Sequence, residues 1–460
     1  MSPNLHVVIL AAGKGTRMRS ALPKVLHRVA GSRMIDYVLD TAAALTPLSQ
    51  TLVVGHRADL VQEALANRPD LRFVVQEPQI GTAHALLMTE PLLAGAEGTA
   101  VLLSGDVPLL TPKTLNRLLE RHVQTRASAT VLTAIVENPH GYGRIVRSGE
   151  RIARIVEEKD ASSAERETRE INAGVYALAL DGLFDAVRAI AAGNSQNEYY
   201  LPDLVALFHG RGLTVEAVTA DDPNEVRGIN SRADLAVTTR LVRDATNQRL
   251  MADGVTLEDP ATTYIDRAVE IGPDTVIHPG VAIEGRSTLG IGCEIHSGAR
   301  IVSSRLGDRV TVHNHSLMVN DSVGDDASIG PFARLRSDVT IGPRAQVGNF
   351  VEMKKSSLGE GSKAMHLSYI GDAVIGERVN IGAGTITCNY DGSGKYTTTI
   401  ERGAFIGSDT QLIAPVTVGE NAYVATGTTV REDVPPGSLA VSAGKQRNIE
   451  GWVKDRKDRQ

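Results

Sequence analysis

A glycine-rich loop near the start of the chain carries the first residues whose types and spacing could do chemistry. It reads Ala11-Ala12-Gly13-Lys14-Gly15-Thr16-Arg17-Met18 and follows the apolar run Leu5–Leu10. Glycines let backbone N–H groups approach a phosphate, and the cations Arg17 and Lys24 follow. The Walker A pattern is absent, and Met18 replaces the third glycine of a dinucleotide-binding loop. The loop therefore predicts phosphate binding of another kind.

A carboxylate follows another apolar run. Asp106 comes after residues 100–103, at the carboxyl end of a predicted strand, where open α/β sheets bind their ligands. A carboxylate at this position could hold Mg²⁺ between phosphate oxygens. The alternative is that Asp106 only caps the turn before Pro108.

These residues need a layered α/β domain to position them. Helical patterns at residues 33–44 and 57–67 alternate with apolar strand-like segments. Leu5–Leu10 is a nearly continuous apolar run, interrupted by His6, as expected of a central parallel strand buried on both faces. We predict a Rossmann-like α/β domain with a mostly parallel sheet, whose further strands lie at residues 51–54, 73–75, 100–103 and 129–136.

Length, charge and cysteine content exclude several classes of protein. The chain of 460 residues is long enough for about three domains. A net charge of −6 argues against nucleic acid as a partner. Two cysteines cannot form a disulfide framework, and we find neither a signal-peptide pattern nor an apolar run long enough to span a membrane. We expect a cytoplasmic protein without membrane insertion.

Beyond residue 270 the chain holds more than half of its 44 glycines and carries a hexapeptide repeat. Aliphatic side chains recur at every sixth position, and glycine often follows them, as at Gly272 and Gly342. One such unit cannot bury its own aliphatic side chain, so successive units must stack as in a parallel β-helix. The three runs are Ile271, Ile277, Ile283, Leu289, Ile295 and Ile301; Val323, Ile329, Leu335, Ile341, Val347 and Met353; and Ile406, Leu412, Val418, Val424 and Val430.

Three units per coil predict about nine coils over residues 271–430, or a rod of roughly 40 Å. The glycines are expected to supply tight corners that residues with a Cβ tolerate poorly. The repeat changes phase at four places, and we expect extruded loops there, on the side where binding loops usually lie. These places are residues 302–322, Leu358, Ile375, and the stretch between Thr387 and Ile406.

The repeat resembles that of hexapeptide acyltransferases, which implies a left-handed β-helix, a homotrimer and acyl-CoA sites between subunits. A purely structural or regulatory rod is the alternative. Read together, LAAGKGTRM and LPK resemble the signature of sugar-phosphate nucleotidyltransferases, and SGD, GYGR, VEEKD, EINAG, NEYYLPD from Asn197 and RGIN follow in that family's order. With GPFARLR, GNFVEMKK, KAMHLSYIGD and GAGTITCNYDG, nearly the whole chain resembles the bifunctional N-acetylglucosamine-1-phosphate uridylyltransferase/glucosamine-1-phosphate acetyltransferase family.

The resemblance implies a first site that uses Mg²⁺ to transfer UMP from UTP to N-acetylglucosamine 1-phosphate. Arg17 and Lys24 would neutralise the triphosphate, and Asp106 and Asn230 would hold the metal. The positions that match contacts to UTP and the sugar are Leu10, Ala11, Ala12, Gly13, Lys24, Gln76, Gly81, Thr82, Gly143, Glu157, Asn172 and Asn230.

The resemblance also implies a second site that acetylates glucosamine 1-phosphate with acetyl-CoA. His366 matches the general base, and Glu352 is a plausible partner for its imidazole. Arg336, Lys354, Tyr369, Asn380 and Lys395 match contacts to the amino sugar phosphate, although charged residues on a coil exterior are by default only solvated. Contacts to acetyl-CoA are matched by Ala383, whose N–H resembles the oxyanion donor, and by Asn389, Tyr390, Ser408, Thr426 and Lys445.

The chain departs from the family pattern near the coenzyme. Thr426 stands where alanine is usual, and Ala443 stands where arginine often supports a phosphate of CoA. Lys445 or Arg447 is expected to substitute for that arginine.

We predict a uridylyltransferase domain at 1–230, one connecting helix at 231–251, and a β-helix acetyltransferase domain at 252–460 with a loosely ordered tail beyond Gly451. Two other interpretations stay open. One is a single-activity pyrophosphorylase with a structural β-helix, and the other is a non-catalytic sugar-nucleotide sensor. The presence of Asp106, Asn230 and His366 argues against both.

Overall fold

The computed structural model describes residues 4–191 and 198–442, with residues 444, 446, 448–450 and 452–453. The chain divides into two compact units, Met1–Val242 and Arg243–Gln460. The division falls inside helix α9 (Arg232–Ala252), at nearly the residues where the sequence predicts one connecting helix, 231–251. The tail predicted to be loosely ordered lies, apart from residues 452–453, outside the described residues. No described helix combines the length and the apolar character that crossing a membrane requires.

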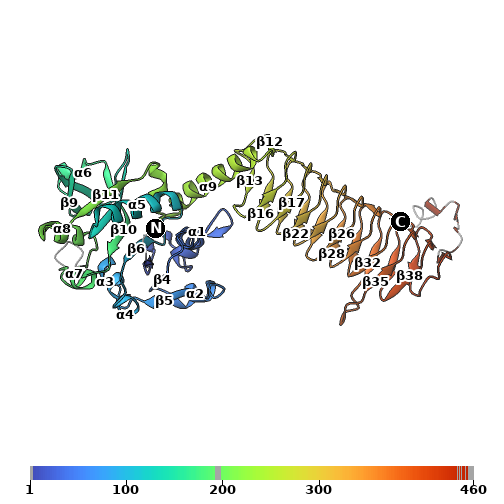
Figure 1. Ribbon diagram of the computed structural model, residues 1–460. Helices are drawn as coiled ribbons and strands as arrows, with labels where there is room; N and C mark the ends of the chain where they lie inside the picture. Colours follow the sequence, from blue (N-terminus) through green and yellow to red (C-terminus); the bar gives the residue numbers. More distant parts are fainter. Residues whose placement is uncertain are drawn as a thin grey trace. The chain divides into compact units, whose positions relative to one another are not determined.

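The first unit contains the predicted sheet, with strands in the order β11-β7-β10-β6-β1-β4-β5 (Figure 1). Strand β1 pairs in parallel with both β4 and β6, whereas β10 is antiparallel to β6 and β7, so the prediction of a mostly parallel sheet is confirmed. The strands are β1 (Leu5–Ala11), β4 (Ser49–Val54), β5 (Leu71–Val75), β6 (Thr99–Ser104), β7 (Ala129–Ile135), β10 (Glu170–Ala179) and β11 (Val215–Thr219).

Strand β1 is buried on both faces, as its nearly continuous apolar sequence predicts. Val7 and Ile9 join one hydrophobic cluster, and Val8 joins a second cluster. Helices cover the two faces: α1 (Met34–Ala43), α2 (Ala58–Ala64), α3 (Thr82–Leu87), α4 (Glu90–Leu93), α5 (Pro112–Thr125), α7 (Leu183–Arg188) and α8 (Asp203–Gly210). The short helix α6 (Ser163–Arg166) buries none of its residues. Further elements are β2 (Arg28–Val29), β3 (Ser32–Arg33), β8 (Arg144–Ser148), β9 (Arg151–Val156), and the short 3-10 helices η1 (Thr16–Met18), η2 (Lys24–Leu26) and η3 (Pro223–Val226).

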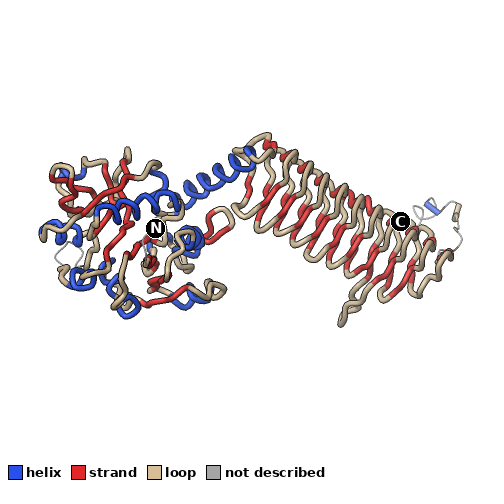
Figure 2. Tube along the Cα trace, in the orientation of Figure 1, coloured by secondary structure: helices blue, strands red, loops and turns tan. Residues whose placement is uncertain are grey.

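The second unit is a left-handed parallel β-helix built from hexapeptide repeats. Its three parallel sheets contain 11, 10 and 9 strands, and Figure 2 shows the short strands separated by corners. The sheets begin at β12 (Thr256–Leu257), β13 (Tyr264–Ile265) and β14 (Glu270–Ile271). They end at β41 (Leu439–Ala440), β40 (Thr429–Val430) and β38 (Val416–Val418). The solenoid is therefore longer than the predicted span of 271–430, because its first strands fall outside the regular apolar runs.

The predicted aliphatic columns form the core of the solenoid. Every residue of the three runs is at most 9% exposed, and all of them belong to one hydrophobic cluster. Stacking of these side chains from coil to coil is the main stabilising interaction of a fold whose units have no core of their own.

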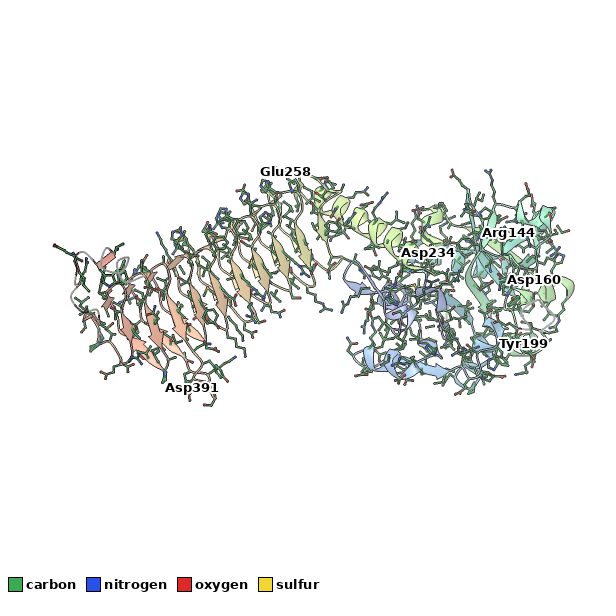
Figure 3. The ribbon with its side chains drawn as sticks, turned by 180° about the vertical axis from the view of Figure 1, so that it is seen from behind. Arg144, Asp160, Tyr199, Asp234, Glu258 and Asp391 are labelled. Carbon is green, nitrogen blue, oxygen red and sulfur yellow. The ribbon has the colours of Figure 1, made fainter. Side chains whose placement is uncertain are left out.

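The phase changes have two different structural causes. Ala282 pairs with Arg300 on the next coil, and Arg300 pairs with Leu317, so the second of these coils spans one residue fewer than the first. The slip around residues 302–322 is therefore a shortened coil, and the prediction of an extruded loop there is wrong. Ile386, by contrast, pairs with Gln411, because the segment after Cys388 leaves the coil. This loop projects from the solenoid, with Asp391 labelled on it in Figure 3.

The glycines that follow the aliphatic residues are needed for a reason other than the predicted one. Gly272, Gly342 and Gly382 have ordinary φ angles, but a Cβ on each would lie 2.5–2.7 Å from backbone of the next coil. The left-handed residue of the corner comes two positions later, as at Asp274 and Arg344. Close approach of coils, rather than positive φ, excludes a side chain at these glycines.

This distinction predicts different costs for two neighbouring glycines. A Cβ on Gly359 would lie 2.3 Å from the Gly376 carbonyl oxygen, whereas Gly361, with φ +66°, has no atom nearer than Arg378 Cγ at 3.8 Å. We expect Gly359→Ala to destabilise the solenoid by about 3 kcal/mol, because backbone must shift. Gly361→Ala should cost only about 1–2 kcal/mol of left-handed strain. Thermal unfolding of both variants checks that Gly359→Ala is the more destabilising change, and equal melting temperatures would contradict this prediction.

Two candidate active sites

The glycine-rich loop begins where β1 ends. Leu10 accepts a hydrogen bond from the Gly105 N–H at 2.9 Å, and Ala12 accepts one from the His56 N–H at 3.3 Å, so the neighbouring strand ends hold the loop. Ala11 is the last residue of β1. A Cβ on Gly13 would meet no atom within 4 Å, which leaves open space over the loop for a ligand.

Gly15 explains how the loop positions Lys24, which the sequence alone did not reveal. Gly15 has φ +58°, and a Cβ on it would lie 2.7 Å from Lys24 Cβ. A larger residue would be strained and would displace the lysine. Met18, at the third glycine's place, is buried and anchors the loop.

Four of the predicted residues of the first site come together. Lys24 Nζ donates a short hydrogen bond to Asp106 Oδ2 and one of 2.7 Å to Asn230 Oδ1. Arg17 Nη2 donates to the same Asn230 oxygen at 2.9 Å. These residues come from positions far apart in the sequence, and Asp106 follows β6 as predicted. Its side chain takes part in an ion pair, so it does more than cap a turn.

The oxygens of Asp106 and Asn230 fit the magnesium site that the family implies. Both converge on one ammonium nitrogen, so they already surround a single cation. A carboxylate and an amide oxygen are the hard ligands that Mg²⁺ prefers. The donor set is therefore compatible with the metal, and Lys24 and Arg17 supply the positive charge for phosphate groups.

The residues matched to the nucleotide base lie after β5. Gln76 Nε2 donates to the Gly81 carbonyl at 2.9 Å and lies 3.2 Å from His84 Nδ1. Gly81 has φ +119°, and a Cβ on it would lie 2.3 Å from the Tyr199 carbonyl. The Thr82 hydroxyl accepts from the Leu201 N–H at 3.0 Å. The second part of the NEYYLPD motif therefore closes this loop, whereas Asn197 lies outside the described residues.

The residues matched to the sugar form another group. Gly143 accepts a hydrogen bond from the Asn172 N–H at 2.9 Å, and a Cβ on Gly143 would lie 3.2 Å from Glu157 Oε1. Asn172 Nδ2 donates to the Tyr176 hydroxyl at 2.7 Å. Burial, with the nearby Asp160 and Asp203 carboxylates, raises the pKa of Glu157 above its ordinary value. Perturbed acids of this kind are common where ligands bind.

Arg144 supports the loop that carries Gly143. It is the last residue of the GYGR motif, and the sequence assigns it no role. Its side chain is labelled in Figure 3. Its guanidinium is almost fully buried, pairs with Glu158 at 2.6 Å, and also bonds the Tyr142 carbonyl. Glu158 in turn accepts from the Gly141 N–H at 3.2 Å. A buried pair of this kind fixes the loop that carries Gly143.

A group of cations lies on the second sheet of the solenoid. Arg336 in β25 (Arg334–Arg336) and Lys354 in β28 (Glu352–Lys354) occupy aligned positions on neighbouring coils. Lys395 comes from the extruded loop. Its ammonium beside Lys354, with further repulsion from Arg336, lowers the pKa of Lys354. Cations that repel one another in this way favour a bound anion such as a phosphate.

Tyr369 and Asn389 lie at the base of the extruded loop. A Cβ on Gly371 would lie 2.4 Å from the Tyr369 hydroxyl and 2.9 Å from Asn389 Nδ2, so the two polar groups are neighbours. Asn389 donates a short hydrogen bond to Asp372. Asp372 was missed by the sequence analysis, although it ends the KAMHLSYIGD motif. Tyr390 lies further along the loop, where its hydroxyl bonds the Gly392 carbonyl at 2.6 Å.

His366 and three of the residues matched to acetyl-CoA follow one column along the first sheet. His366 ends β30 (Lys363–His366), and β33 (Asn380–Ile381), β36 (Phe405–Ile406) and β39 (Tyr423–Val424) continue the sheet. On neighbouring coils, Ala364 pairs with Ile381, Ile381 with Ile406, and Ile406 with Val424. The residues two positions after each of these four are therefore aligned from coil to coil. Those aligned positions are His366, Ala383, Ser408 and Thr426.

The carboxylate of Glu352, the expected partner of His366, forms its ion pairs with two arginines. The Glu352 carboxylate pairs with Arg336 at 2.9 Å and with Arg334 at 3.6 Å on the second sheet. His366 lies on the first sheet, directly opposite Asn349 of β27 (Gln346–Asn349). The Asn349 Oδ1 atom is buried without a hydrogen-bond partner in the described part of the chain.

The remaining predicted residues are Asn380 and three residues near the end of the chain. Asn380 is on the first sheet, whereas Arg336, Lys354 and Tyr369 are on the second. Ala443, Lys445 and Arg447 lie outside the described residues. The described residues predicted for the second site therefore lie on two different sheets of the solenoid.

The comparisons with known proteins agree with both halves of this structure. Residues 7–173 match the MobA-like NTP transferase domain, and residues 397–432 match the bacterial transferase hexapeptide family. The chain is 49% identical to "Bifunctional protein GlmU" of Pelobacter propionicus over 98% of both chains. The chain belongs to the bifunctional GlmU family. Proteins of the same name from Geotalea uraniireducens and Exiguobacterium sp. are 48% and 47% identical, over 98% and 97% of this chain.

As a GlmU family member, the chain is a bifunctional enzyme with uridylyltransferase and acetyltransferase activity. The two other interpretations, a single-activity pyrophosphorylase and a non-catalytic sensor, are therefore wrong. The glycine-rich loop, Asp106 and Asn230 belong to the first unit, and His366 belongs to the second unit.

Exposed apolar side chains line the corner beside His366. Phe332, Phe350 and Leu367 are 47%, 57% and 65% exposed, although all three hold left-handed φ angles. The rings of His315, Phe332 and Phe350 stack along neighbouring coils, with centroids 5.2 and 5.4 Å apart. A strip of this kind on a protein surface is typical of an interface.

Proposed function

We propose that this GlmU family chain acetylates glucosamine 1-phosphate with acetyl-CoA and then transfers UMP from UTP to N-acetylglucosamine 1-phosphate. The products are CoA, UDP-N-acetylglucosamine and pyrophosphate. The observation that carries the proposal is the convergence of Arg17, Lys24, Asp106 and Asn230 in the first unit, together with a separate histidine and cation group in the second. Mass spectrometry of the products from all three substrates tests it. Absence of the acetylated sugar nucleotide would contradict it.

At the first site, the sugar phosphate attacks the α-phosphorus of UTP in line, and pyrophosphate leaves. Arg17 and Lys24 neutralise the charge of the phosphate groups as it shifts toward the leaving group. Gln76, Gly81 and Thr82 orient the uracil, while Gly143, Glu157 and Asn172 orient the sugar. Asp106 and Asn230 would hold Mg²⁺, which would supply charge neutralisation for the phosphate groups.

At the second site, His366 takes the proton of the sugar ammonium, and the freed amine attacks the thioester carbonyl. The Ala383 carbonyl accepts from the Asp409 N–H at 2.7 Å, whereas the Ala383 N–H has no partner in the described part of the chain. This N–H is free to stabilise the tetrahedral oxyanion. Arg336, Lys354 and Lys395 bind the phosphate of the sugar, and Tyr369, Asn380, Asn389, Tyr390, Ser408, Thr426 and Lys445 complete the contacts to sugar and coenzyme.

The acetyltransferase works as a homotrimer in this proposal. The exposed strip of Phe332, Phe350 and Leu367 adjoins His366, and the residues of the site are divided between two sheets of one subunit. A second copy that covers the strip would bring its own groups to the same histidine. Sedimentation of the full chain should give a trimer. A fully active monomer would contradict the shared site.

Neighbouring lysines allow a matched test of the phosphate group. Lys354→Gln should raise the KM for glucosamine 1-phosphate about tenfold with little change in kcat, because a charge-assisted contact to a distant phosphate stabilises ground and transition states alike. Lys355→Gln removes the same charge from the left-handed corner position beside it and should leave KM unchanged. Steady-state acetyl transfer with both variants measures the effect. Equal KM values would remove Lys354 from the site.

We place the reaction in the cytoplasm. Cys293 and Cys388 are both free thiols, which suits a reducing compartment.

A further inference from the structure

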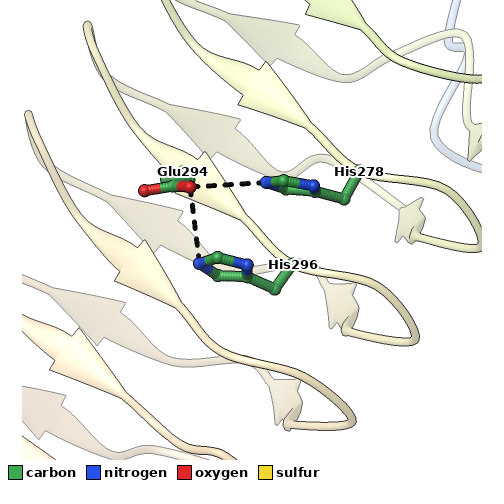
Figure 4. A group of neighbouring side chains, drawn as sticks. All are labelled: His278, Glu294 and His296. Atoms are coloured by element: carbon green, nitrogen blue, oxygen red, sulfur yellow. Dashed lines mark hydrogen bonds and ion pairs between the residues drawn. The ribbon is translucent and has the colours of Figure 1, made fainter.

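Histidines and glutamates form a compact group at the start of the first sheet of the solenoid, in the second unit and apart from His366. His278 follows β15 (Val276–Ile277), and Glu294 and His296 flank Ile295 in β18 (Glu294–Ile295). The register Ile277↔Ile295 places His278 opposite His296 on the next coil. Their rings stack with centroids 4.7 Å apart and an interplanar angle of 12° (Figure 4).

The geometry of the three side chains is close to that of a metal centre. Glu294 Oε1 lies 3.4 Å from His278 Nε2 and 3.6 Å from His296 Nε2. One potential ligand atom from each residue lies within 4.8 Å of the other two. Bonds of about 2.0–2.1 Å place tetrahedral ligand atoms roughly 3.4 Å apart, so both nitrogen-to-oxygen distances already match. Only the two imidazole rings need a small rotation, which brings their Nε2 atoms closer together.

A further carboxylate fixes the orientation of the first histidine. Glu258, which follows β12, lies 3.0 Å from His278 Nδ1. When Nδ1–H donates to Glu258, Nε2 carries the lone pair and faces the Glu294 carboxylate. Two acceptors that face each other at 3.4 Å need a proton or a metal ion between them. A carboxylate that holds the outer nitrogen of a ligating histidine is the common arrangement around zinc.

We propose that His278 Nε2, His296 Nε2 and the Glu294 carboxylate bind a divalent transition-metal ion of the Zn²⁺ class. Imidazole nitrogens select such ions over Mg²⁺ and Ca²⁺, and three protein ligands leave a fourth position to water. The ligands come from two successive coils, so the ion cross-links them where the solenoid starts. His313 continues the ring stack, but its Nε2 bonds Ser328 at 3.0 Å, and it is not a ligand.

Equilibrium dialysis of the full chain against Zn²⁺ tests the site. An excess of Mg²⁺ keeps the oxygen ligands of Asp106 and Asn230 occupied. We expect one Zn²⁺ fewer per chain in the variant His278→Ala/His296→Ala and also in Glu294→Gln. His315→Asn is the matched control, because His315 belongs to the same solenoid and lies outside the group, and it should keep the full stoichiometry. Equal stoichiometry in all of these proteins would overturn the proposal.

Glu258→Gln provides a second, graded readout. Because Glu258 acts through His278 rather than on the metal, its loss should weaken Zn²⁺ affinity about 10- to 100-fold and leave the stoichiometry at saturation unchanged. Co²⁺ in place of Zn²⁺ should give visible d–d absorption that the double-histidine variant lacks. Should that variant fail to fold, Glu294→Gln decides with the same two measurements. An unchanged Zn²⁺ affinity in Glu258→Gln, or a Co²⁺ spectrum that Glu294→Gln does not alter, would contradict the ligand set.

Discussion

Asp106→Ala should lower the rate of uridylyl transfer by about three orders of magnitude, since it removes a ligand worth several kcal/mol of charge stabilisation. The same carboxylate is the ion-pair partner of Lys24. Its loss would also let the lysine drift from the phosphate position. Acetyl transfer should keep its full rate, because it takes place in the other unit. Separate steady-state assays of the two half-reactions measure both effects.

The control for this change is Asp70→Ala, which removes an exposed carboxylate from the same unit. The Asp70→Ala protein should keep both activities. Loss of acetyl transfer in folded Asp106→Ala protein would mean that the two sites are not independent. Uridylyl transfer at a near-normal rate would mean that Asp106 only caps its turn.

His366→Ala should have the opposite result, with acetyl transfer reduced about 10²- to 10⁴-fold and uridylyl transfer unchanged. The expected loss is large because the sugar amine reacts only after it gives up its proton. His366 is exposed at the end of β30, so truncation should not disturb the core. His209→Ala, which removes an exposed histidine of α8, is the control.

The pH profile separates a base from a merely structural histidine. A general base gives kcat/KM a pH dependence, so the acetyl-transfer profile of the native chain should differ in shape from that of His366→Ala. The residual activity of His366→Ala should lose that dependence. A variant with the native profile at a lower rate would show that another group is the base.

The sequence predicted the solenoid well because its signal is local and repeated. The aliphatic columns follow from the period of six, and all of them are buried. The shortened coil after Arg300 was not predicted, since an apolar pattern does not distinguish a missing residue from an inserted loop. The need for Gly359 depends on the backbone of the next coil at Gly376, which no local rule reports.

The first site was predictable only as an ordered set of motifs. Nothing local in the sequence joins Lys24 to Asp106 and Asn230, yet the sheet brings them to one point. The assignment of Glu352 to His366 stays a prediction, because their spacing along the chain does not say which sheet each occupies. The group at His278 and His296 had a signal, a spacing that matches one full coil, and the sequence analysis did not use it.

The central claim, that two independent sites act in sequence through a free intermediate, has one direct test. Asp106→Ala and His366→Ala proteins are mixed and given glucosamine 1-phosphate, acetyl-CoA and UTP. Each protein alone should form UDP-N-acetylglucosamine only at its low residual rate, and the mixture should form it much faster after a lag, because acetylated sugar phosphate released by the first diffuses to the second. A mixture that stays inactive, although each protein retains its own half-reaction, would contradict the account.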